Sequence, residues 1–530
     1  MDFISWKIGL ECEDDKNQIS TSDDFEREEN LPPRHDFQSI RAHCLAEGTL
    51  YEDPDFPAND FSIYQTSPPS SDASPPIEWK RPGEIVSEPK FVTDGYSRFD
   101  VRQGQLGNCW FIASCATLTS RPGLFKRVVP QNNSQFDDDQ YAGVFHFYFW
   151  QYGQWVEVIV DDRLPVSDDD TVLLYMSSSV QEEFWAALLE KAYAKLHGSY
   201  SALSSGTGAE GMVDLTGGIT EFYPLKGSEP ADLFERIERN LARESLLTAG
   251  INDDQDEQLK SVNLVPKHEY SVTKVVRLNA KQHMLGNEFS EDVRLICVRN
   301  PWGEREWSGA WGDHSLEWIL VTDEKMAKLN IAQEDGEFWM KFEDFVKYFD
   351  DLSLCYQCPC DMSEELKRCH PWEMVTQLGE WKRNRTAGGS DPKSFWRNPQ
   401  FILKLEGKWR QNERLKVPDI SLTVGLMQMY HRARGTKNLS LRLLIYPIPD
   451  HVLVEHRSLP SVFFENVDPI EIDANFKTTR ELVVRYNLPP GRYVIVPHTW
   501  KPNQESEFLL RIFAEGRIEK VCYGDDECEE

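Results

Sequence analysis

The chain has 530 residues, a formal net charge of −31 and no run of 18 apolar residues. Its length predicts two or three packed units, and its 40% hydrophobic and 12% aromatic content is typical of a globular, enzyme-sized protein. The excess of 88 acidic over 57 basic residues disfavours nucleic acid as a partner, because such a surface repels phosphate backbones.

The N-terminal residues carry no targeting pattern. Met1 to Asp15 are acidic and lack the basic and apolar regions of a signal peptide, so we expect a cytoplasmic protein. Its eleven cysteines are then expected to be reduced thiols. One cluster admits a zinc interpretation, but it lacks a second separated C-x-x-C pair, so we do not favour zinc. The cluster is Cys355, Cys358, Cys360, Cys369 and His370.

The predicted elements change in kind along the chain. Residues 1–35 read as an acidic arm, and the Pro- and Ser-rich stretch Ser67 to Pro76 as a loop. A mixed α and β part follows, with a helix at Glu183 to Leu196. Its strands are predicted at Val156 to Val160, Tyr270 to Val276 and Val293 to Val298.

Short strands separated by turns dominate after about residue 358, which predicts an antiparallel β-sandwich up to residue 515. These strands are Phe401 to Leu405, Leu422 to Gln428, Ser440 to Tyr446, Glu481 to Tyr486, Arg492 to Val496 and Phe508 to Phe513. Residues 516–530 are predicted to be an acidic tail. The fold class is therefore α+β.

A candidate nucleophile follows a loop that contains two glycines. The segment QGQLGNCW, residues 103–110, leads into the apolar run Phe111 to Leu118, which predicts a buried helix that begins at Cys109. The positive end of a helix dipole stabilises a thiolate, the species that attacks a carbonyl. The side-chain amide of Gln103 and the backbone N–H of Cys109 are candidate donors to the oxyanion that forms.

A thiolate of this kind needs a base and a group that orients it. His268 opens an alternating strand, where a rigid backbone can aim its imidazole. Asn300 follows the strand Val293 to Val298 and is a candidate to fix the imidazole tautomer, while Trp302 would shield that hydrogen bond from water.

These blocks resemble the active-site blocks of the calpain family: QGQLGNCWFIAS, HEYSVT and NPWGEREWSGAW. The similarity continues through EDPDFPAND and EFWAALLEKAYAKLHGSY to the TAGGS and FWRNPQF blocks. It implies a papain-like core of two subdomains, residues 36–214 with the cysteine and 215–357 with the histidine and asparagine. A calpain-type β-sandwich follows at residues 358–515. It also implies that Cys109 is the nucleophile, His268 the base, Asn300 the orienting group and Gln103 the oxyanion donor.

The sequence departs from the family pattern at two places. Asn108 stands where an Asp is usual, and Lys267 and Glu269 place charges beside His268 where small residues are usual. We expect Lys267 to lower and Glu269 to raise the imidazole pKa, so that the pH optimum shifts while the mechanism persists.

The resemblance also implies two calcium sites, which need six to eight oxygen ligands each. The first would use the carboxylates of Asp100 and Glu183 with the carbonyls of Thr93 and Gly95. The second would use the side chains of Glu306, Asp313, Asp335 and Glu337 with the carbonyl of Gln333. Calcium would regulate the enzyme by ordering loops that bring the two halves of the site together.

Two features of the family are missing from this sequence. It contains no EF-hand loop pattern, so recruitment of a small regulatory subunit through a penta-EF-hand domain is not expected. The segment Lys408 to Pro418 is basic where the family's sandwich carries an acidic loop. With Arg432, Arg434 and Lys437, it is a candidate for weak contact with anionic phospholipid, but we favour the simpler interpretation of a solvated face.

The sequence thus predicts a calcium-dependent cysteine endopeptidase that performs limited proteolysis of protein substrates. Two alternatives stay open. One is a catalytically silent adaptor of the same fold, in which the charges around His268 have disabled the site. The other is a related acyl transferase such as a transglutaminase, which Asn300 disfavours because that class normally uses an Asp in the third place.

Overall fold

The computed structural model describes residues 36–64, 77–167, 172–252, 257–284, 287–321, 326, 329, 335–357, 373–406, 420–452, 458–470, 475–514 and 517–523. Several predictions from the sequence lie outside these ranges: the acidic arm, the Ser67 to Pro76 loop, Gln333, the zinc candidates other than Cys355, the Lys408 to Pro418 segment and the end of the acidic tail. Two compact units result. Unit 1 extends to Gly206 and also contains Asn300–Glu304 and Glu334–Gly336, and unit 2 contains the remainder.

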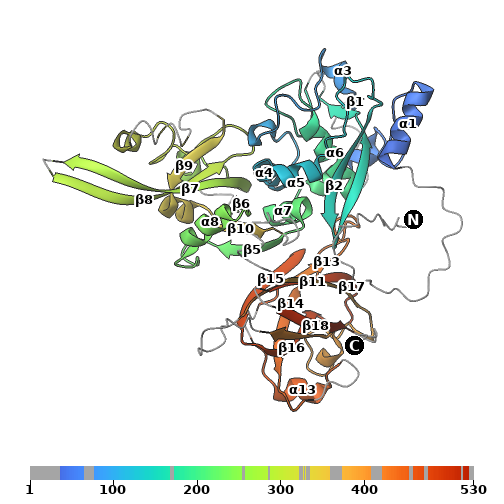
Figure 1. Ribbon diagram of the computed structural model, residues 1–530, viewed down its shortest axis with the longest axis vertical. Helices are drawn as coiled ribbons and strands as arrows, with labels where there is room; N and C mark the ends of the chain where they lie inside the picture. The colour runs from blue at the N-terminus through green and yellow to red at the C-terminus, as the bar shows by residue number, and fades with distance from the viewer. Residues whose placement is uncertain are drawn as a thin grey trace. The chain divides into compact units, whose positions relative to one another are not determined.

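Unit 1 is built around the antiparallel hairpin of β2 and β3, against which helix α6 packs (Figure 1). Helix α4 is apolar on all sides, and every residue from Trp110 to Leu118 is buried, as expected of a helix in the middle of a core. Gly198 follows the last residue of helix α6 and adopts the left-handed conformation common at helix C-termini. The elements of unit 1 are α1 (Phe37–Glu47), α2 (Asp60–Ile63), β1 (Glu78–Lys80), α3 (Pro82–Ile85), η1 (Arg98–Asp100), α4 (Cys109–Leu118), α5 (Pro122–Val128), β2 (Val144–Gln151), β3 (Gln154–Asp161), β4 (Leu164–Val166), α6 (Trp185–His197) and η2 (Ser201–Leu203).

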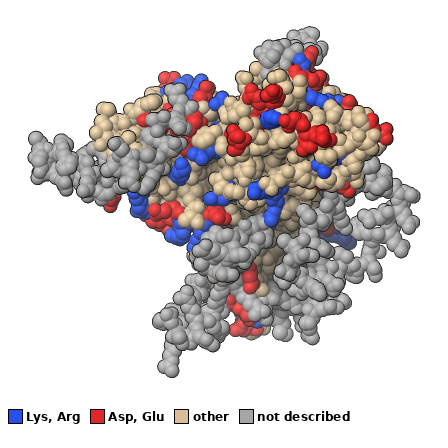
Figure 2. Space-filling view, turned by 45° about the horizontal axis from the view of Figure 1, so that its top comes forward, with Lys and Arg blue, Asp and Glu red and all other residues tan. Residues whose placement is uncertain are grey.

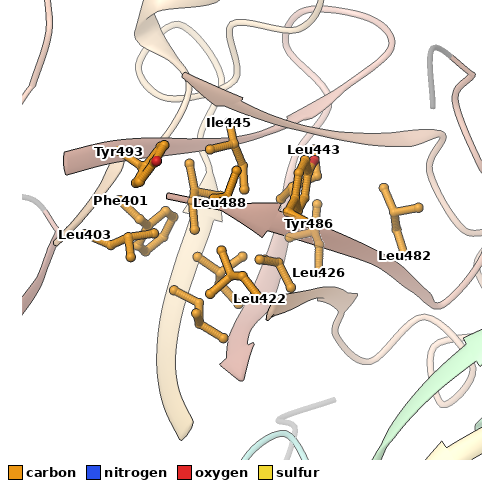
Figure 3. Close-up of a cluster of buried hydrophobic side chains, with 14 of the residues drawn as sticks. Phe401, Leu403, Leu422, Leu426, Leu443, Ile445, Leu482, Tyr486, Leu488 and Tyr493 are labelled. Carbon is orange, nitrogen blue, oxygen red and sulfur yellow. The ribbon is translucent and has the colours of Figure 1, made fainter. Parts of the chain in front are cut away.

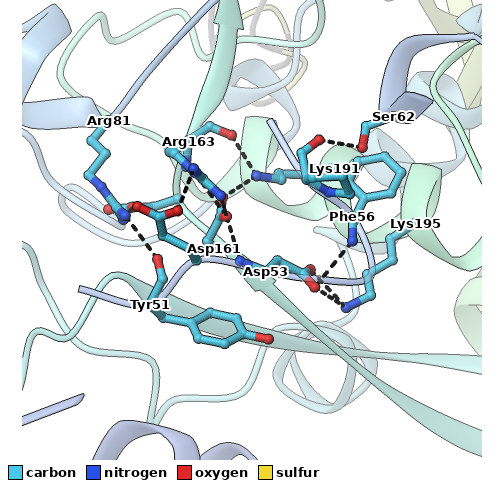
Figure 4. Close-up of polar contacts among 12 residues, drawn as sticks. Tyr51, Asp53, Phe56, Ser62, Arg81, Asp161, Arg163, Lys191 and Lys195 are labelled. Atoms are coloured by element: carbon cyan, nitrogen blue, oxygen red, sulfur yellow. Dashed lines mark hydrogen bonds and ion pairs between the residues drawn. The ribbon is translucent and has the colours of Figure 1, made fainter. Parts of the chain in front are cut away.

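Buried charges fasten the segment before α2 to this core (Figure 4). The carboxylate of Asp161 accepts hydrogen bonds from Lys191 Nζ at 2.5 Å and from the backbone N–H of Asp53 at 2.8 Å. Lys195 Nζ binds the Asp53 carboxylate at 2.7 Å. Each charge is paired, as buried charges must be, so the network fixes residues near Asp53 against α6 and β3.

Unit 2 begins with a six-stranded antiparallel sheet in the order β5-β10-β6-β7-β8-β9. Helix α7 contacts β5, β6 and β10, helix α8 contacts β7, and α11 contacts β8 and β9. The elements of this part are α7 (Gly208–Thr216), β5 (Ile219–Pro224), α8 (Leu233–Ala242), β6 (Leu246–Ile251), α9 (Glu257–Ser261), β7 (His268–Met284), β8 (Asn287–Arg299), η3 (Leu316–Leu320), β9 (Glu337–Lys341), α11 (Phe342–Tyr348) and β10 (Asp351–Tyr356).

The second part of unit 2 is a β-sandwich, residues 373–523, of two four-stranded antiparallel sheets in the orders β11-β17-β13-β15 and β14-β16-β12-β18. Alternate residues of its strands point inward and form one apolar core that includes Phe401, Leu422, Ile445 and Tyr486 (Figure 3). Its elements are β11 (Glu373–Trp381), η5 (Phe395–Arg397), β12 (Phe401–Glu406), β13 (Ile420–Gln428), β14 (Leu441–Ile448), α13 (Ser461–Asn466), β15 (Glu481–Leu488), β16 (Gly491–Thr499), β17 (Ser506–Ala514) and β18 (Arg517–Tyr523).

Buried arginines of the sandwich bind the first part of unit 2. Arg480 donates two hydrogen bonds to the Asp214 carboxylate of α7, at 2.6 and 2.8 Å. Arg511 of β17 donates to the carbonyl oxygens of Gly217 and Gly218, which follow α7, at 3.1 and 2.7 Å. These contacts attach the sandwich to the end of α7.

The antiparallel sandwich after an α+β part confirms the predicted fold class, but two boundaries differ from the sequence prediction. The first subdomain was predicted to end at residue 214, yet α7 packs on the six-stranded sheet and groups with unit 2 from Thr207 onward. The sandwich was predicted to end at residue 515, yet β18 pairs with β12. β18 contains three charged residues in its first four, which hides its apolar alternation, as is common for edge strands.

Acidic and basic side chains are interspersed on the face shown in Figure 2. None of the helices in the part of the chain that the structure describes has both the length and the hydrophobicity of a membrane span.

Candidate active site

Cys109 is the first residue of α4, as the sequence predicts. Cys44, Cys115, Cys297 and Cys355 are buried, whereas Cys109 is only partly so. Burial raises the pKa of Cys115 well above its ordinary value, which makes that thiol unreactive. Cys109 combines access to solvent with the positive end of a helix dipole, and this is the setting of a reactive thiolate.

Gln103 is held in a defined orientation within unit 1. Its Oε1 accepts a hydrogen bond from Trp302 Nε1 at 2.8 Å, and its Nε2 donates to the carbonyl of Leu106 at 2.7 Å. The Gln103 backbone N–H also donates to the carbonyl of Pro301 at 3.2 Å. Because the indole N–H can only donate, it fixes which end of the amide is the oxygen. The second N–H of Nε2 is left to serve as the predicted oxyanion donor.

Asn300 belongs to unit 1 together with Cys109, although the sequence analysis placed it in the second subdomain. Its side chain is buried, with Nδ2 donating to the carbonyl of Glu304 at 2.8 Å and Oδ1 accepting from the backbone N–H of Trp302 at 3.0 Å. The loop from Asn300 to Glu304 is therefore folded around this side chain. Trp302, predicted as a shield, has the further contact with Gln103 that no sequence pattern indicated.

His268 is the first residue of β7 in unit 2, where the sequence predicts it. Its imidazole is buried and lies edge-on to the ring of Tyr270, with 5.1 Å between ring centroids. Since residues two apart share a strand face, Glu269 projects to the other face. The position of Glu269 next to Gly250, described below, agrees with this orientation.

Glu269 and Asp351 flank Gly250, the residue paired with both of them across the sheet. A Cβ added at Gly250 would lie 3.0 Å from Asp351 Oδ1 and 3.2 Å from Glu269 Oε2. Burial, and then the charge of Asp351, raise the pKa of Glu269 to about 8. The carboxyl is therefore largely protonated at pH 7. We expected Glu269 to raise the imidazole pKa as an anion. Its own raised pKa leaves this half-buried carboxyl mainly neutral at pH 7, and the effect of Glu269 on His268 stays a prediction.

The residues of the first predicted calcium site lie together in unit 1. Glu183 Oε1 accepts a hydrogen bond from the backbone N–H of Thr93 at 2.7 Å, in the same loop as Gly95. Burial, and then the charge of Asp100, raise the pKa of Glu183 to about 7. The hydroxyl of Thr93 is shielded from solvent and has no hydrogen-bond partner. Converging carboxylates and an unpaired oxygen fit a cation that prefers oxygen ligands.

The described residues of the second predicted calcium site, unlike those of the first, are divided between the two units. Glu337 accepts a hydrogen bond from Thr273 Oγ1 at 2.8 Å within the sheet, and Asp335 belongs to unit 1, whereas Glu306 and Asp313 belong to unit 2. In the ranges that the structure describes, no group of three or more His, Cys, Asp or Glu side chains that could hold a metal ion is found, so both calcium sites stay predictions.

Sequence reasoning missed one buried acid near the nucleophile. Glu190 of α6 accepts a hydrogen bond from Asn108 Nδ2 at 2.6 Å. The helix was interpreted mainly as packing, because its apolar face dominates the pattern. The signal was present as the two adjacent charged residues Glu190 and Lys191 within the otherwise apolar segment LLEKAYA of the helix.

A partly exposed cysteine begins a buried helix, a glutamine in the same unit is held in a fixed orientation, and an α+β core precedes a β-sandwich. Together these features define a papain-like cysteine protease fold. Residues 51–356 match the calpain family cysteine proteases, and residues 377–513 match domain III of the calpain large subunit. This chain belongs to the calpain family.

Individual calpains align over almost all of this chain. Calpain-A of Drosophila melanogaster is 41% identical over 491 residues, which cover 91% of this chain and 57% of that protein. Calpain-8 of Mus musculus is 41% identical over 92% of this chain and 69% of its own length. The catalytic subunit of human Calpain-2 is 39% identical over 93% of this chain and 69% of its own length. The chain thus spans little more than half the length of the Drosophila relative.

Proposed function

We propose that this chain is a calcium-dependent, cytoplasmic cysteine endopeptidase that cleaves proteins at a limited number of sites. The observation that carries the proposal is the partly exposed Cys109 at the start of α4, together with the orientation of the Gln103 side chain by Trp302 within the same unit. A buried structural cysteine needs neither the helix start nor an oriented amide. Membership of the calpain family supports the same chemistry.

In the proposed mechanism the Cys109 thiolate attacks the carbonyl carbon of the scissile peptide bond. The oxyanion is stabilised by the Gln103 Nε2 and Cys109 backbone N–H donors, a contribution of about 100-fold to 1000-fold per donor. His268 takes the thiol proton and returns it to the leaving amine, while Asn300 orients the imidazole. Water then hydrolyses the thioester, with His268 as general base.

Calcium would be held at the first site by Asp100 and Glu183 with carbonyl oxygens of the Thr93 loop. Bound there, it would offset the repulsion between the two carboxylates and order the loop. The pairing of Glu183 with Thr93 and the effect of Asp100 on its pKa support this assignment. In the proposed mechanism calcium does not contact the substrate, and the cleavage of the peptide bond uses side chains and backbone N–H groups alone.

The candidate lipid contact receives little support from the described residues. Arg432 forms an ion pair with Glu210, and Arg434 lies 3.4 Å from the carboxylate of Glu507. Arginines with acidic partners are less able to bind lipid phosphate, which favours the solvated-face interpretation. The silent-adaptor alternative is also less attractive as far as Glu269 is concerned, because a pKa of about 8 leaves this half-buried carboxyl mainly neutral at pH 7.

A thiol-reactive epoxide tests the proposal. With calcium present, the adduct is expected on the peptide that contains Cys109, and replacing His268 with alanine should slow its formation by at least about tenfold, since the base is lost. Peptide mass spectrometry reads the position of the adduct, and the buried Cys115 serves as an internal control. A labelling rate that does not depend on calcium, or equal labelling of other cysteines, would favour the catalytically silent adaptor.

A further inference from the structure

A carboxyl group lies buried behind the nucleophile in unit 1. Glu190, in the middle of α6, is 1% exposed and accepts two hydrogen bonds from neutral N–H groups. Asn108 Nδ2 donates to its Oε1 at 2.6 Å, and the backbone N–H of Met176 donates to its Oε2 at 2.9 Å. A buried carboxyl is costly, so both contacts need an explanation.

The first contact reaches the residue before the nucleophile. Asn108 occupies the N-cap position of α4, yet its side chain does not cap the helix. It turns to Glu190 instead. The carbonyl of Asn108 accepts from the N–H groups of Phe111 and Ile112, so Asn108 is fixed both to the helix and to Glu190. Because Asn108 directly precedes Cys109, the position of Asn108 determines the position of the Cys109 backbone.

The second contact reaches the loop that carries Gln103. Ser177, next to Met176, exchanges backbone hydrogen bonds with Arg102 at 2.8 and 3.1 Å. Leu174 accepts a hydrogen bond from the N–H of Gln105 at 3.0 Å. One carboxyl group thus connects the segment 174–177, and through it residues 102–105, with Asn108.

The loop between Gln103 and Asn108 is tightly packed against neighbouring backbone. A Cβ at Gly104 would lie 2.3 Å from the carbonyl oxygen of Tyr175, and one at Gly107 would lie 2.9 Å from that of Ser204. A shift of segment 174–177 therefore has to move Gln103 with it. A displacement of about 1 Å in a catalytic group can cost about 100-fold in rate.

We propose that Glu190 is a positioning residue that sets Cys109 and Gln103 at their working separation through Asn108 and Met176. This inference rests on the proposed protease function and adds a residue to its machinery. Glu190 itself does not touch the substrate.

Asn108 can serve both protonation states of Glu190. Burial raises the pKa of Glu190 to about 7, and the titratable groups that face it, Cys115, Tyr175 and Tyr200, stay neutral there because burial raises their pKa values. An ionised Glu190 accepts from Asn108 Nδ2, as observed. A protonated Glu190 would donate to Asn108 Oδ1, which is buried and has no partner in the observed orientation. A turn of the amide would accommodate the proton.

The test uses two substitutions of Glu190 and one control. E190Q imitates the protonated group, because its amide can donate to Asn108 Oδ1 and still accept from Met176. E190L removes both hydrogen bonds at similar volume. D162N is the control, since Asp162 is also fully buried in unit 1 but binds Arg81 and Tyr141. Three quantities are measured for each protein: kcat and KM for a peptide substrate, the melting temperature, and the pH profile of Cys109 alkylation by iodoacetamide.

We expect E190L to lower kcat by about 100-fold with less than about a threefold change in KM. E190Q should retain kcat within about tenfold. We expect an inflection near pH 7 in the wild-type alkylation profile and its loss in E190Q. D162N should melt at a lower temperature without this loss of kcat. An E190L protein with the wild-type kcat and alkylation profile would overturn the proposal, and so would an equal loss of kcat in D162N.

The alkylation profile separates this inference from the proposed function. If the wild-type protein cleaves nothing, the proposed function fails, but the profiles of the wild type and E190Q still decide whether Glu190 acts on Cys109. If E190L does not fold, the same comparison decides, and identical profiles would refute the role of Glu190.

Discussion

The ion pair between Asp214 and Arg480 allows a quantitative test of how the sandwich is attached to the first part of unit 2. The two side chains are 1% and 6% exposed and share two hydrogen bonds. Removing one partner of such a pair leaves a buried charge without compensation and costs about 3–5 kcal/mol. Asp214→Leu and Arg480→Met should therefore each lower the free energy of unfolding of unit 2 by that amount. At about 2–4 °C per kcal/mol, the melting temperature should fall by roughly 6–20 °C.

The double variant D214L/R480M distinguishes an ion pair from two independent packing residues. Replacing both charges with apolar groups leaves no buried charge, so the double variant should be more stable than either single variant. Differential scanning calorimetry gives the comparison, and Asp232→Ala, at an exposed pair with Arg236, is the control with no expected change. Single losses below about 1 kcal/mol, or losses that simply add in the double variant, would refute the reasoning.

Three further predictions concern the site. Gln103→Ala should lower kcat by about 100-fold to 1000-fold with an unchanged melting temperature, and a loss confined to KM would contradict its role as an oxyanion donor. Glu183→Gln should weaken calcium binding measured by calorimetry with calcium chloride, and an unchanged affinity would exclude Glu183 as a ligand. The pKa of Glu269, raised from 4.5 to about 8, predicts stability that is present at low pH and is lost as the pH rises through 8, by up to about 1.4 kcal/mol per pH unit. Melting curves from pH 6 to 9 should show this loss in the wild type and a smaller one in E269Q, so parallel curves would show that Glu269 does not titrate there.

The sequence predicted those parts of the fold whose pattern is local. The start of α4 at Cys109 follows from a glycine-containing loop before an apolar run, and the inner sandwich strands follow from their alternation. Of the four edge strands of the sandwich, β14 and β15 were predicted, whereas β11 and β18 were missed because charged and polar residues interrupt their apolar alternation. The helix predicted from Glu183 begins at Trp185, since the Glu183 carboxylate turns to Thr93.

The parts of the site that escaped prediction depend on distant partners. Glu190 meets Asn108 across 82 residues, and Trp302 meets Gln103 across 199 residues, so no spacing indicates either contact. The neutral state of Glu269 depends on burial and on Asp351 in another strand. Strand alternation places Glu269 on the face opposite His268, but the sequence does not show that Asp351 lies across the sheet from it.

Calcium should permit the Cys109 thiol of this chain to cleave peptide bonds. The decisive measurement is the rate at which the purified full chain and its Cys109→Ser variant fragment an unfolded protein, with calcium and with a calcium chelator. We expect fragmentation by the wild type with calcium alone and none by the variant under either condition. Equal fragmentation by the variant, or wild-type cleavage at the same rate in the chelator, would contradict it.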